Sequence, residues 1–488
     1  MKRRQNNTVI GKMGQRFDSI IGVVSPKAAF RRAQFRAAYD ALSGHRTNST
    51  HNTQGGTGDI HLDEHSLWKL REICRDLATN NPLVKGLLKR ERNSVVGSGA
   101  RVEARAVDAS GEPDEKWNDQ AEEMFEDWSQ NCDITGRFSF KQYQRMMFMS
   151  YRRDGDMATG LIDGKLLAAE GEQIGTPLGL KTTDITVING VAFDKAGGRL
   201  LGYYIGKPDK WGYIQTGNFQ KYLAQDICHH FNPERFSYSR GEPALASAIN
   251  TIDKLSSYID AELVAAKVNA CLSAFISRKD PAAEWSGIGE LVTNNDGKTE
   301  RQEKMEPGQI LYGEVGESAT LLGQTRPGQI FDTFVLRCLS LIGQPLCIPL
   351  MLVSLDFSGA TFMNARFAYN EARDNWQAEQ DFVLKPFVSR IWRWKISQFI
   401  KAGDLEARPD AWNHEVFCRK WPYVDPYREA QADTIQLENR TTDRRDICSR
   451  QGRDWRDIDE QLKREGPASK DGKGTKKTGE SQDDDADQ

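Results

Sequence analysis

The densest cluster of soft metal ligands in this chain is Cys228-His229-His230. Zinc requires about four ligands that converge on one point, whereas consecutive residues of a strand point to opposite faces. No fourth ligand lies nearby in the sequence. A strand histidine satisfied by its neighbours is therefore the favoured interpretation, and we expect neither a metal site nor a cofactor.

Paired carboxylates, which could serve as an acid and a base, occur at Asp154 and Asp156. The surrounding run Arg152-Arg153-Asp154-Gly155-Asp156 is rich in charge and contains a glycine. Such a composition is typical of a solvated turn. We therefore expect these two acids on the surface, without a catalytic role.

The run Asp356-Phe357-Ser358-Gly359 is similar to the Asp-Phe-Gly motif of protein kinases, but the other kinase motifs are missing. The sequence also lacks GxxxxGK[ST], GxSxG, HExxH, and GxGxxG after a predicted strand. Without a phosphate loop, a nucleophile elbow or a zinc motif, the chain is not expected to be an enzyme.

Composition restricts the class of protein further. The 488 residues include 28% charged residues and have a net charge of −3, so no overall positive charge indicates nucleic-acid binding. The eight cysteines show no CxxC spacing, which favours reduced thiols. Apolar runs are too short for a membrane span, and no apolar segment follows the basic start, so a cytoplasmic protein is expected.

The predicted elements begin after a basic N-terminal arm, residues 1–58, with one short helical pattern at 27–42. The arm either docks on a neighbour or is a disordered, solubilising terminus. Apolar residues then recur at helical spacing from 63 to 88, and 95–104 has the pattern of a strand.

Two amphipathic helices are predicted at 115–128 and 140–151, the second with Tyr143, Met146, Met147 and Ser150 facing inward. Core packing explains these Met and aromatic stripes better than a cofactor pocket does. Short strands separated by turns at Asn189-Gly190 and 197–198 follow up to residue 231. The order of elements predicts an α+β region and not an alternating βαβ fold.

The second half is dominated by long helices. Apolar spacing predicts a rod from residue 241 to 280, about 50 Å long, which is longer than one globular core needs. A Gly-rich insertion with strand candidates at 309–312 and 319–322 separates it from an antiparallel helix at 328–343. Next come a loop and a helix at 362–401 that Pro386 should kink. A strand at 412–418, helices at 425–461 and a disordered tail are expected to follow.

Several stretches together resemble the lambda-family portal proteins of tailed bacteriophages. The resemblance extends from Leu67 to Glu465, and no single motif decides it. The order of the motifs is what makes it specific. The stretches are Leu70–Pro82 with Val95-Val96-Gly97-Ser98-Gly99, His230–Arg235 with Arg240-Gly241-Glu242-Pro243, Pro307-Gly308, and Pro422–Gln461 with Asp425-Pro426 and Gly452-Arg453-Asp454.

The resemblance implies an α+β portal-type subunit with long stem helices, a small α+β wing, an inserted clip and a helical C-terminal crown. The implied map is as follows: arm 1–58, wing 59–240, first stem helix 241–280, clip 281–325, second stem helix 326–344, tunnel loop 345–366, long kinked helix and wing return 367–424, crown 425–465, and disordered tail 466–488.

It also implies a ring, a dodecamer in the family, at one capsid vertex of the virion. Double-stranded DNA would pass through its channel during packaging and ejection, and the ring would dock terminase, the major capsid protein or scaffold, and a head-completion adaptor. No membrane and no catalysis are implied. From the residues alone, two alternatives stay open: an enzyme of the packaging machinery, or a cytoplasmic adaptor that does not bind DNA.

The tunnel loop of the family carries an Asp-Phe-Ser run and a later arginine, which Asp356, Phe357, Ser358 and Arg366 match. Residues 361–364 depart from the family's Asn-Tyr-Ser-Ser, so the hydroxyls of that Tyr and of both Ser are lost here. Lys254 and Lys267 on the rod are the other candidates for contact with DNA in the channel. The residues predicted for the loop are Asp356, Phe357, Ser358, Gly359, Ala360, Thr361, Phe362, Met363, Asn364 and Arg366.

Overall fold

The computed structural model describes most of the chain between residues 56 and 450, as well as 455, 458–459 and 462–463. Within 56–450 it leaves out 61, 109, 181, 197, 277–289, 294–298, 303–308, 313–330 and 422–425. The helical pattern at 27–42, the strand candidate at 319–322 and the tail at 466–488 lie outside the described residues.

The predicted wing, residues 59–240, begins with a 3-10 turn, η1 (Gly58–Ile60), and two capped helices, α4 (Glu64–Asn80) and α5 (Pro82–Val95). The Asp63 carboxylate accepts from the Ser66 amide at 3.1 Å at the start of α4. Asn81 does the same for α5, accepting from the amides of residues 83 and 84. These caps satisfy amides that have no partner within the helix, and both predicted helices are confirmed.

Helices α6 (Glu115–Ser129) and α7 (Phe140–Asp154) confirm the next two predictions. Their aromatic residues pack on the last long helix, as shown by the 5.0 Å between the ring centroids of Phe125 and Trp392. Met147 is buried, but Met146 is 40% exposed, so its predicted inward orientation is wrong. One position along a helix turns a side chain by about 100°, enough to take it out of the core.

The sheets of the wing are antiparallel, as expected for an α+β region. One has the order β3-β2-β8 and the other β4-β5-β6-β7. Asn189 and Gly190 both have positive φ and join β4 to β5, as a two-residue hairpin requires. The strands and 3-10 turns of this region are β2 (Asp156–Ile162), β3 (Lys165–Glu170), η2 (Gly171–Gln173), β4 (Ile185–Ile188), β5 (Val191–Asp194), β6 (Leu200–Pro208), β7 (Ile214–Leu223), η3 (Ala224–Asp226) and β8 (Ile227–Phe231).

The strand predicted at 95–104 is shorter in the structure. Val95 still belongs to α5, and only β1 (Arg101–Ala104) is extended, pairing with β13 (His414–Phe417). Gly97 and Gly99 between them have φ of 58° and 105°, so they form a turn that a strand cannot contain. The strand predicted around 412–418 is confirmed by β13.

The expected rod of about 35 residues is also shorter. After a 3-10 turn, η4 (Ala246–Ala248), helix α8 runs from Ile249 to Cys271 and is followed by strand β9 (Leu272–Ile276). At 1.5 Å per residue its 23 residues span roughly 35 Å. The apolar spacing at 272–275 fits a helix as well as a strand, so it could not show that the helix ends before β9. The strand is set by its parallel pairing with β12 (Gln309–Tyr312), a strand that the sequence predicted.

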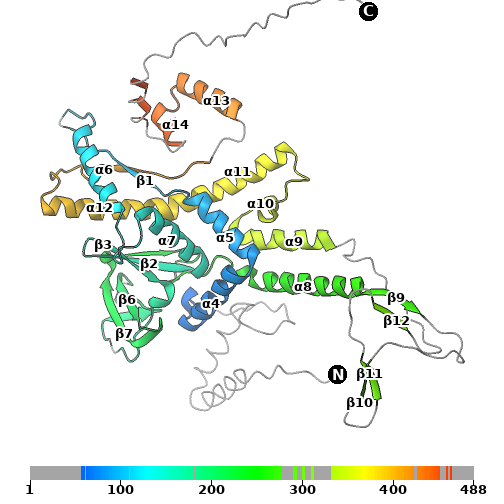
Figure 1. Ribbon diagram of the computed structural model, residues 1–488. Helices are drawn as coiled ribbons and strands as arrows, with labels where there is room; N and C mark the ends of the chain where they lie inside the picture. The colour runs from blue at the N-terminus through cyan, green and yellow to red at the C-terminus, as the bar shows by residue number, and fades with distance from the viewer. Residues whose placement is uncertain are drawn as a thin grey trace, which may run out of the picture.

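Helix α9 (Phe331–Gly343) lies beside α8 and runs in the opposite direction (Figure 1), which confirms the predicted antiparallel pair. The Tyr258 ring of α8 stacks on Phe331 and meets Phe334 edge-on. Two short elements then turn the chain, η5 (Gln344–Leu346) and α10 (Leu350–Ser354). Two strands of the insertion, β10 (Glu290–Thr293) and β11 (Thr299–Gln302), form a separate antiparallel pair.

The helix predicted at 362–401 is α11 (Phe362–Glu379) and α12 (Lys385–Ala402), joined by a π-helical turn, η6 (Gln380–Leu384). Pro386 is the second residue of α12, so the irregularity precedes the proline, and the wider π turn accommodates the ring that would clash with the preceding turn. The run crosses the molecule above the wing sheets (Figure 1). Helices α13 (Pro426–Glu438) and α14 (Arg444–Arg450) follow β13 and agree with the predicted helices there.

Candidate functional site

The loop between α10 and α11 begins with a residue in an uncommon conformation. Leu355 lies in the left-handed region, with φ of 60°, and its side chain is 62% exposed. A leucine there costs about 1–2 kcal/mol because its Cβ approaches the following carbonyl oxygen. The chain therefore changes direction sharply at the end of α10.

The turn that follows is held by the Asp356 carboxylate. Its Oδ1 accepts from the Ser358 amide at 2.9 Å and from the Ser358 hydroxyl at 2.6 Å. These hydrogen bonds hold the pKa of Asp356 below its usual value, so the exposed loop keeps a negative charge near neutral pH. A Cβ added at Gly359 would meet no atom within 4 Å, so this part of the loop is open.

Helix α11 begins inside the predicted loop. The Thr361 hydroxyl accepts from the Asn364 amide at 3.3 Å and caps the helix, so Phe362–Arg366 form its first turn and are not part of an irregular loop. Phe362 and Met363 are 58% and 57% exposed. Although residues 361–364 differ from the family's sequence, they supply a helix cap and an apolar first turn of the helix.

The other predicted contact residues lie on a different element. Lys254 and Lys267 are exposed on α8, and α9 and α10 lie between that helix and α11 (Figure 1). The structure thus brings Asp356 and Ser358 together, while the two lysines lie apart from the loop.

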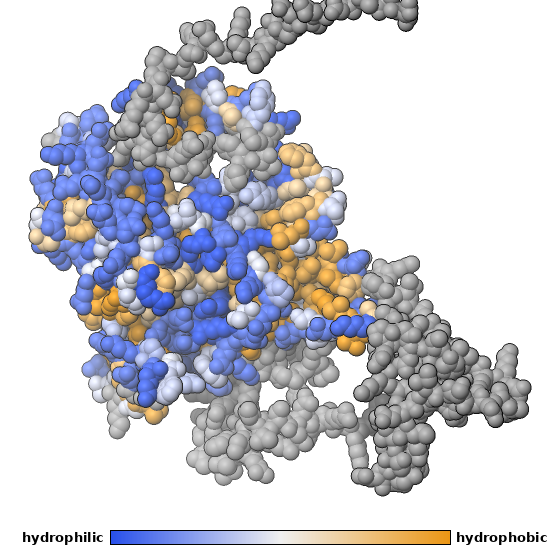
Figure 2. Space-filling model, viewed as in Figure 1, coloured by the Kyte–Doolittle hydropathy of each residue, from blue (hydrophilic) through white to orange (hydrophobic). Residues whose placement is uncertain are grey.

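An uncovered apolar face extends from α8 across α9 to α11. Figure 2 shows hydrophobic side chains gathered over this part of the molecule. Soluble monomers rarely expose so many large apolar side chains in one region. The large exposed apolar residues of this face are Leu263, Val264, Phe334, Leu341, Leu355, Phe357, Phe362, Met363 and Phe367.

The acids at 154 and 156 are not on the surface, contrary to the sequence-based expectation. Asp156 is completely buried, and its carboxylate is held by Arg71 at 2.6 Å, by Arg240 and by His229 at 3.1 Å. Burial by itself would raise the pKa of Asp156, but the two guanidinium groups and the His229 hydrogen bond lower it well below its usual value. Asp156 is therefore charged and forms the centre of a buried ionic network.

This network fixes the segment that leads into α8 against the sheets before it. Arg240 precedes the stem and also donates to the carbonyl oxygens of residues 174 and 189, both at 2.8 Å. The neighbouring Asp154, also fully buried, is bound by Arg75 and by Arg153. The partners of these buried ion pairs come from different helices, strands and loops, so the network is complete in only one arrangement of those elements.

The end of α11 is tied to the wing by a second buried group. Arg152 lies 2.7 Å from Glu91 and 3.2 Å from Glu379, the last residue of α11. Next to it, the side-chain amide nitrogen of Gln380 donates to two backbone oxygens, those of Val95 and Arg419, each at 2.8 Å. The π turn thus starts at residues that are bound to α5, α7 and the segment after β13.

His229 and His230 have separate partners on opposite sides of β8. His229 binds Asp156, whereas His230 lies 3.4 Å from the Thr159 hydroxyl and meets the Phe387 ring edge-on. Burial lowers the pKa of His230 to about 3, so this imidazole is neutral. Among the described residues, no group of three or more His, Cys, Asp or Glu side chains is arranged to hold a metal ion, and no helix is long and apolar enough to cross a membrane.

Comparison with known proteins assigns the family. The family model for phage portal proteins of the lambda family matches residues 44–380, more than half of the chain. This chain belongs to that family. The portal family membership agrees with the resemblance noted in the sequence.

One curated relative of this portal family member is the "Probable portal protein" of Halomonas phage phiHAP-1. The two are 24% identical over 441 residues, covering 86% of this chain and 84% of the relative. Among solved structures, a chain from the "Neck of empty GTA particle computed with C6 symmetry" is similar, with 14% identity, a TM-score of 0.40 and coverage of 79% and 94%. A chain from the "Neck of native GTA particle computed with C12 symmetry" has 14% identity, a TM-score of 0.36 and coverage of 78% and 92%.

Sequence reasoning missed the residues that fix the sheets of the 59–240 region to the segment leading into α8. Asp154 and Asp156 follow two arginines and flank a glycine, a local pattern identical to that of a solvated turn. The signal that would have separated the two cases is nonlocal, because Arg71 and Arg240 lie 85 and 84 positions away. No window of the sequence shows that these charges meet.

Proposed function

We propose that this chain assembles into a closed ring at one capsid vertex and forms the channel through which viral DNA is packaged and ejected. A head-to-tail interface closes into a ring when the rotation between neighbours is suitable. In this proposal the ring has about twelve copies, as the family resemblance implies, and it is a structural component of the virion without catalysis of its own.

The observation that carries the proposal is the uncovered apolar face on α8, α9 and α11. Leu263 and Val264 are 55% and 59% exposed on one side of α8, and Phe334 and Leu341 are 48% and 56% exposed on α9. Fully burying an exposed side chain of this kind contributes roughly 1.5–3 kcal/mol, so covering one that is about half exposed contributes about half of that. A neighbouring copy that covers this face would supply several such contributions at each interface of the ring.

The proposed map keeps the boundaries derived from the family resemblance: wing 59–240, stem 241–280 and 326–344, clip 281–325, tunnel loop 345–366, and crown 425–465. The described helices α8 and α9 supply the stem, and the loop between α10 and α11 supplies the tunnel constriction. The clip would meet terminase and later an adaptor, while the wing would meet the capsid or scaffold.

Inside the channel, the loop would act through shape and backbone position. It carries one acid, Asp356, and one base, Arg366, with Phe357 and Met363 exposed beside them. Strong cationic contacts would slow sliding, because each neutralised phosphate adds salt-dependent affinity. Lys254 and Lys267 on α8 are the proposed additional contacts with DNA.

Ring formation is tested by native mass spectrometry and negative-stain microscopy of purified wild-type protein and two variants. We expect a large closed ring for the wild type, loss of the ring for Leu263→Asp, and an unchanged ring for Leu178→Asp, which makes the same change at an exposed leucine of the wing. A wild-type protein that stays monomeric under all conditions contradicts the proposal.

The channel assignment needs a separate test in complete heads. Removing residues 358–360 should impair DNA packaging or retention while the ring still forms, because these residues lie outside the apolar face and before the Thr361 cap, and they are exposed apart from the half-buried Ala360. Normal packaging and retention by rings with the deletion would show that this segment is not the constriction.

A further inference from the structure

A row of cations without acidic partners lies along α5 and the elements beside it. We call it the α5 ridge: Lys85, Lys89, Arg92, Arg145 and Arg419. Among the described residues, none of the five has a carboxylate within ion-pair distance, whereas most arginines of the wing do. Five uncompensated positive charges on one surface indicate an anionic partner.

The guanidinium groups of the ridge converge on one neutral residue. Arg92 and Arg145 each place a nitrogen 3.0 Å from the same Asn93 side-chain oxygen, and Arg419 donates to the Asn93 backbone oxygen. Partial burial lowers the pKa of Arg92, and the charge of Arg145 lowers it further, as expected when like charges crowd. An anion placed here would relieve this repulsion and accept charge-assisted hydrogen bonds.

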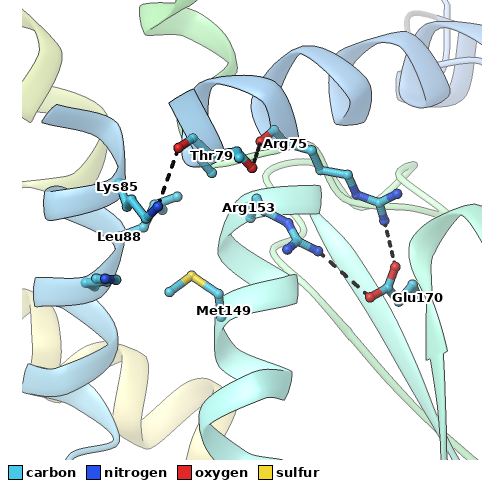
Figure 3. Close-up of a pocket in the computed structure, with 9 residues that line it drawn as sticks. Arg75, Thr79, Lys85, Leu88, Met149, Arg153 and Glu170 are labelled. Atoms are coloured by element: carbon cyan, nitrogen blue, oxygen red, sulfur yellow. Dashed lines mark hydrogen bonds and ion pairs between the residues drawn. The ribbon is translucent and has the colours of Figure 1, made fainter. Parts of the chain in front are cut away.

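The other end of the ridge borders a pocket of about 440 Å³ (Figure 3). Its apolar lining comes from Ala78, Leu88 and Met149, and α5 contributes Lys85 and Lys89. On the opposite side, Arg75 and Arg153 are already engaged by Glu170, at 3.0 and 4.0 Å. The two lysines are therefore the cations of the pocket that remain available: within the described part of the chain neither has a carboxylate in ion-pair distance, and Lys85 donates to the Thr79 carbonyl oxygen at 3.4 Å.

We propose that the α5 ridge binds the acidic segment Asp483–Asp487 of this chain, from the same or another copy. The segment carries four aspartates in five residues, against five cations on the ridge. Its extended length is about 13 Å, and Lys85, Lys89 and Arg92 span about 10 Å along one face of the helix. Asp483 lies 20 positions after Lys463, which gives a maximum reach of roughly 65 Å.

The match in length favours this segment over DNA as the occupant. A ridge of about 10 Å faces only a few phosphates of a duplex, which gives little nonspecific affinity. The tail segment is tethered, so its local concentration is high even if each contact is weak. The contact goes beyond channel formation and does not depend on it, because both parts belong to this chain.

The first test couples carboxylates directly to neighbouring amines in the full-length protein with a water-soluble carbodiimide. We expect the tryptic peptide 478–488 to be linked to Lys85 and Lys89 at least tenfold more often than to Lys116, an equally exposed lysine on α6. Equal coupling to Lys116 and to the ridge lysines overturns the proposal.

The second test measures binding of a fluorescein-labelled peptide 478–488. The receptor is the full chain with its four tail aspartates replaced by asparagine, so that its own segment does not compete. Lys89→Glu with Arg92→Glu should weaken binding at least tenfold, whereas Lys116→Glu should change it less than twofold. If a 20-bp duplex at equal charge binds the ridge more tightly than the peptide does, the ridge is a DNA contact and the tail assignment is wrong.

Discussion

Replacing Asp156 by asparagine should strongly destabilise the wing. The substitution keeps the shape of the side chain but removes the negative charge that faces Arg71 and Arg240, whose side chains are only 4% and 1% exposed. Removing one partner of a buried ion pair costs about 3–5 kcal/mol, because it leaves a charge uncompensated. Backbone oxygens also accept from both guanidinium groups, so we expect the lower end, about 3 kcal/mol.

This loss converts into a measurable change in melting temperature. A unit of about 180 residues such as the wing loses roughly 2–4 °C per kcal/mol, so Asp156→Asn should melt about 6–12 °C below the wild type. The matched control is Asp163→Asn, an exposed residue of the same sheet region with φ of 47°, a conformation that asparagine tolerates well. Its melting temperature should stay within about 2 °C of the wild type.

The pH dependence gives a second check of the same reasoning. The pKa of Asp156 is lower in the folded state than its ordinary value near 3.9, so the unfolded state takes up protons first as the pH falls. Its stabilising contribution is complete above that ordinary value and is lost only in stronger acid. The difference between wild type and Asp156→Asn should therefore be constant from pH 7 to about pH 5.5 and shrink below pH 4. A difference below 2 °C at pH 7 would refute the assignment of Asp156 as the charged centre of the network.

Three further outcomes are expected from the structure. Gly155→Ala should destabilise the protein by about 3 kcal/mol, measured by thermal melting, because Gly155 has φ of 91° and a Cβ would lie 2.6 Å from the Gly241 carbonyl oxygen; a stable alanine variant would contradict this close approach. His230 is buried and neutral, with its pKa lowered to about 3. The unfolded state therefore binds more protons below about pH 6.5, and the stability of the folded state decreases as the pH is lowered. From the ordinary pKa of 6.5, that loss is roughly 2 kcal/mol at pH 5, and His230→Gln should flatten the urea-denaturation profile between pH 7 and 5; an equally steep profile would show that other groups cause the loss. Leu355→Asn should stabilise the protein by up to ~1 kcal/mol and so raise its melting temperature slightly, because asparagine tolerates the left-handed region and the leucine is 62% exposed. A lower melting temperature would show that packing of the leucine side chain stabilises the fold.

Local patterns gave the helices and most of the strands. Asp63 and Asn81 cap helices because a side-chain oxygen can reach free amides two or three residues ahead, and such a contact is visible in sequence. The hairpin at Asn189-Gly190 depends on two adjacent positive φ values, which these residue types favour. Where a stop signal was weak, as at the end of α8, the pattern extended the helix too far, because β9 is determined by pairing with a strand 37 residues away.

The features of the candidate site also fall into those with a local cause in the sequence and those that only the fold creates. The position of the loop between two helices, and the Asp356 turn within it, follow from neighbouring residues. The helix start at Thr361 also has a local cause, since its hydroxyl caps the amide three positions ahead, but the resemblance to the family had assigned this stretch to the loop. The α5 ridge combines residues from three parts of the chain, and only the fold brings Arg145 and Arg419 to Asn93.

What the sequence by itself determined is the family, the mixed α+β class, and the approximate ends of elements whose signals lie within a few residues. Only the tertiary structure decided which charges are buried. Asp154 and Asp156 have the neighbours of a surface turn, yet both are fully buried, because arginines from α4 and from the stem entry supply the opposite charge. The energy of a buried ion depends on what surrounds it in three dimensions, and a sequence window contains only the part of those surroundings that is local.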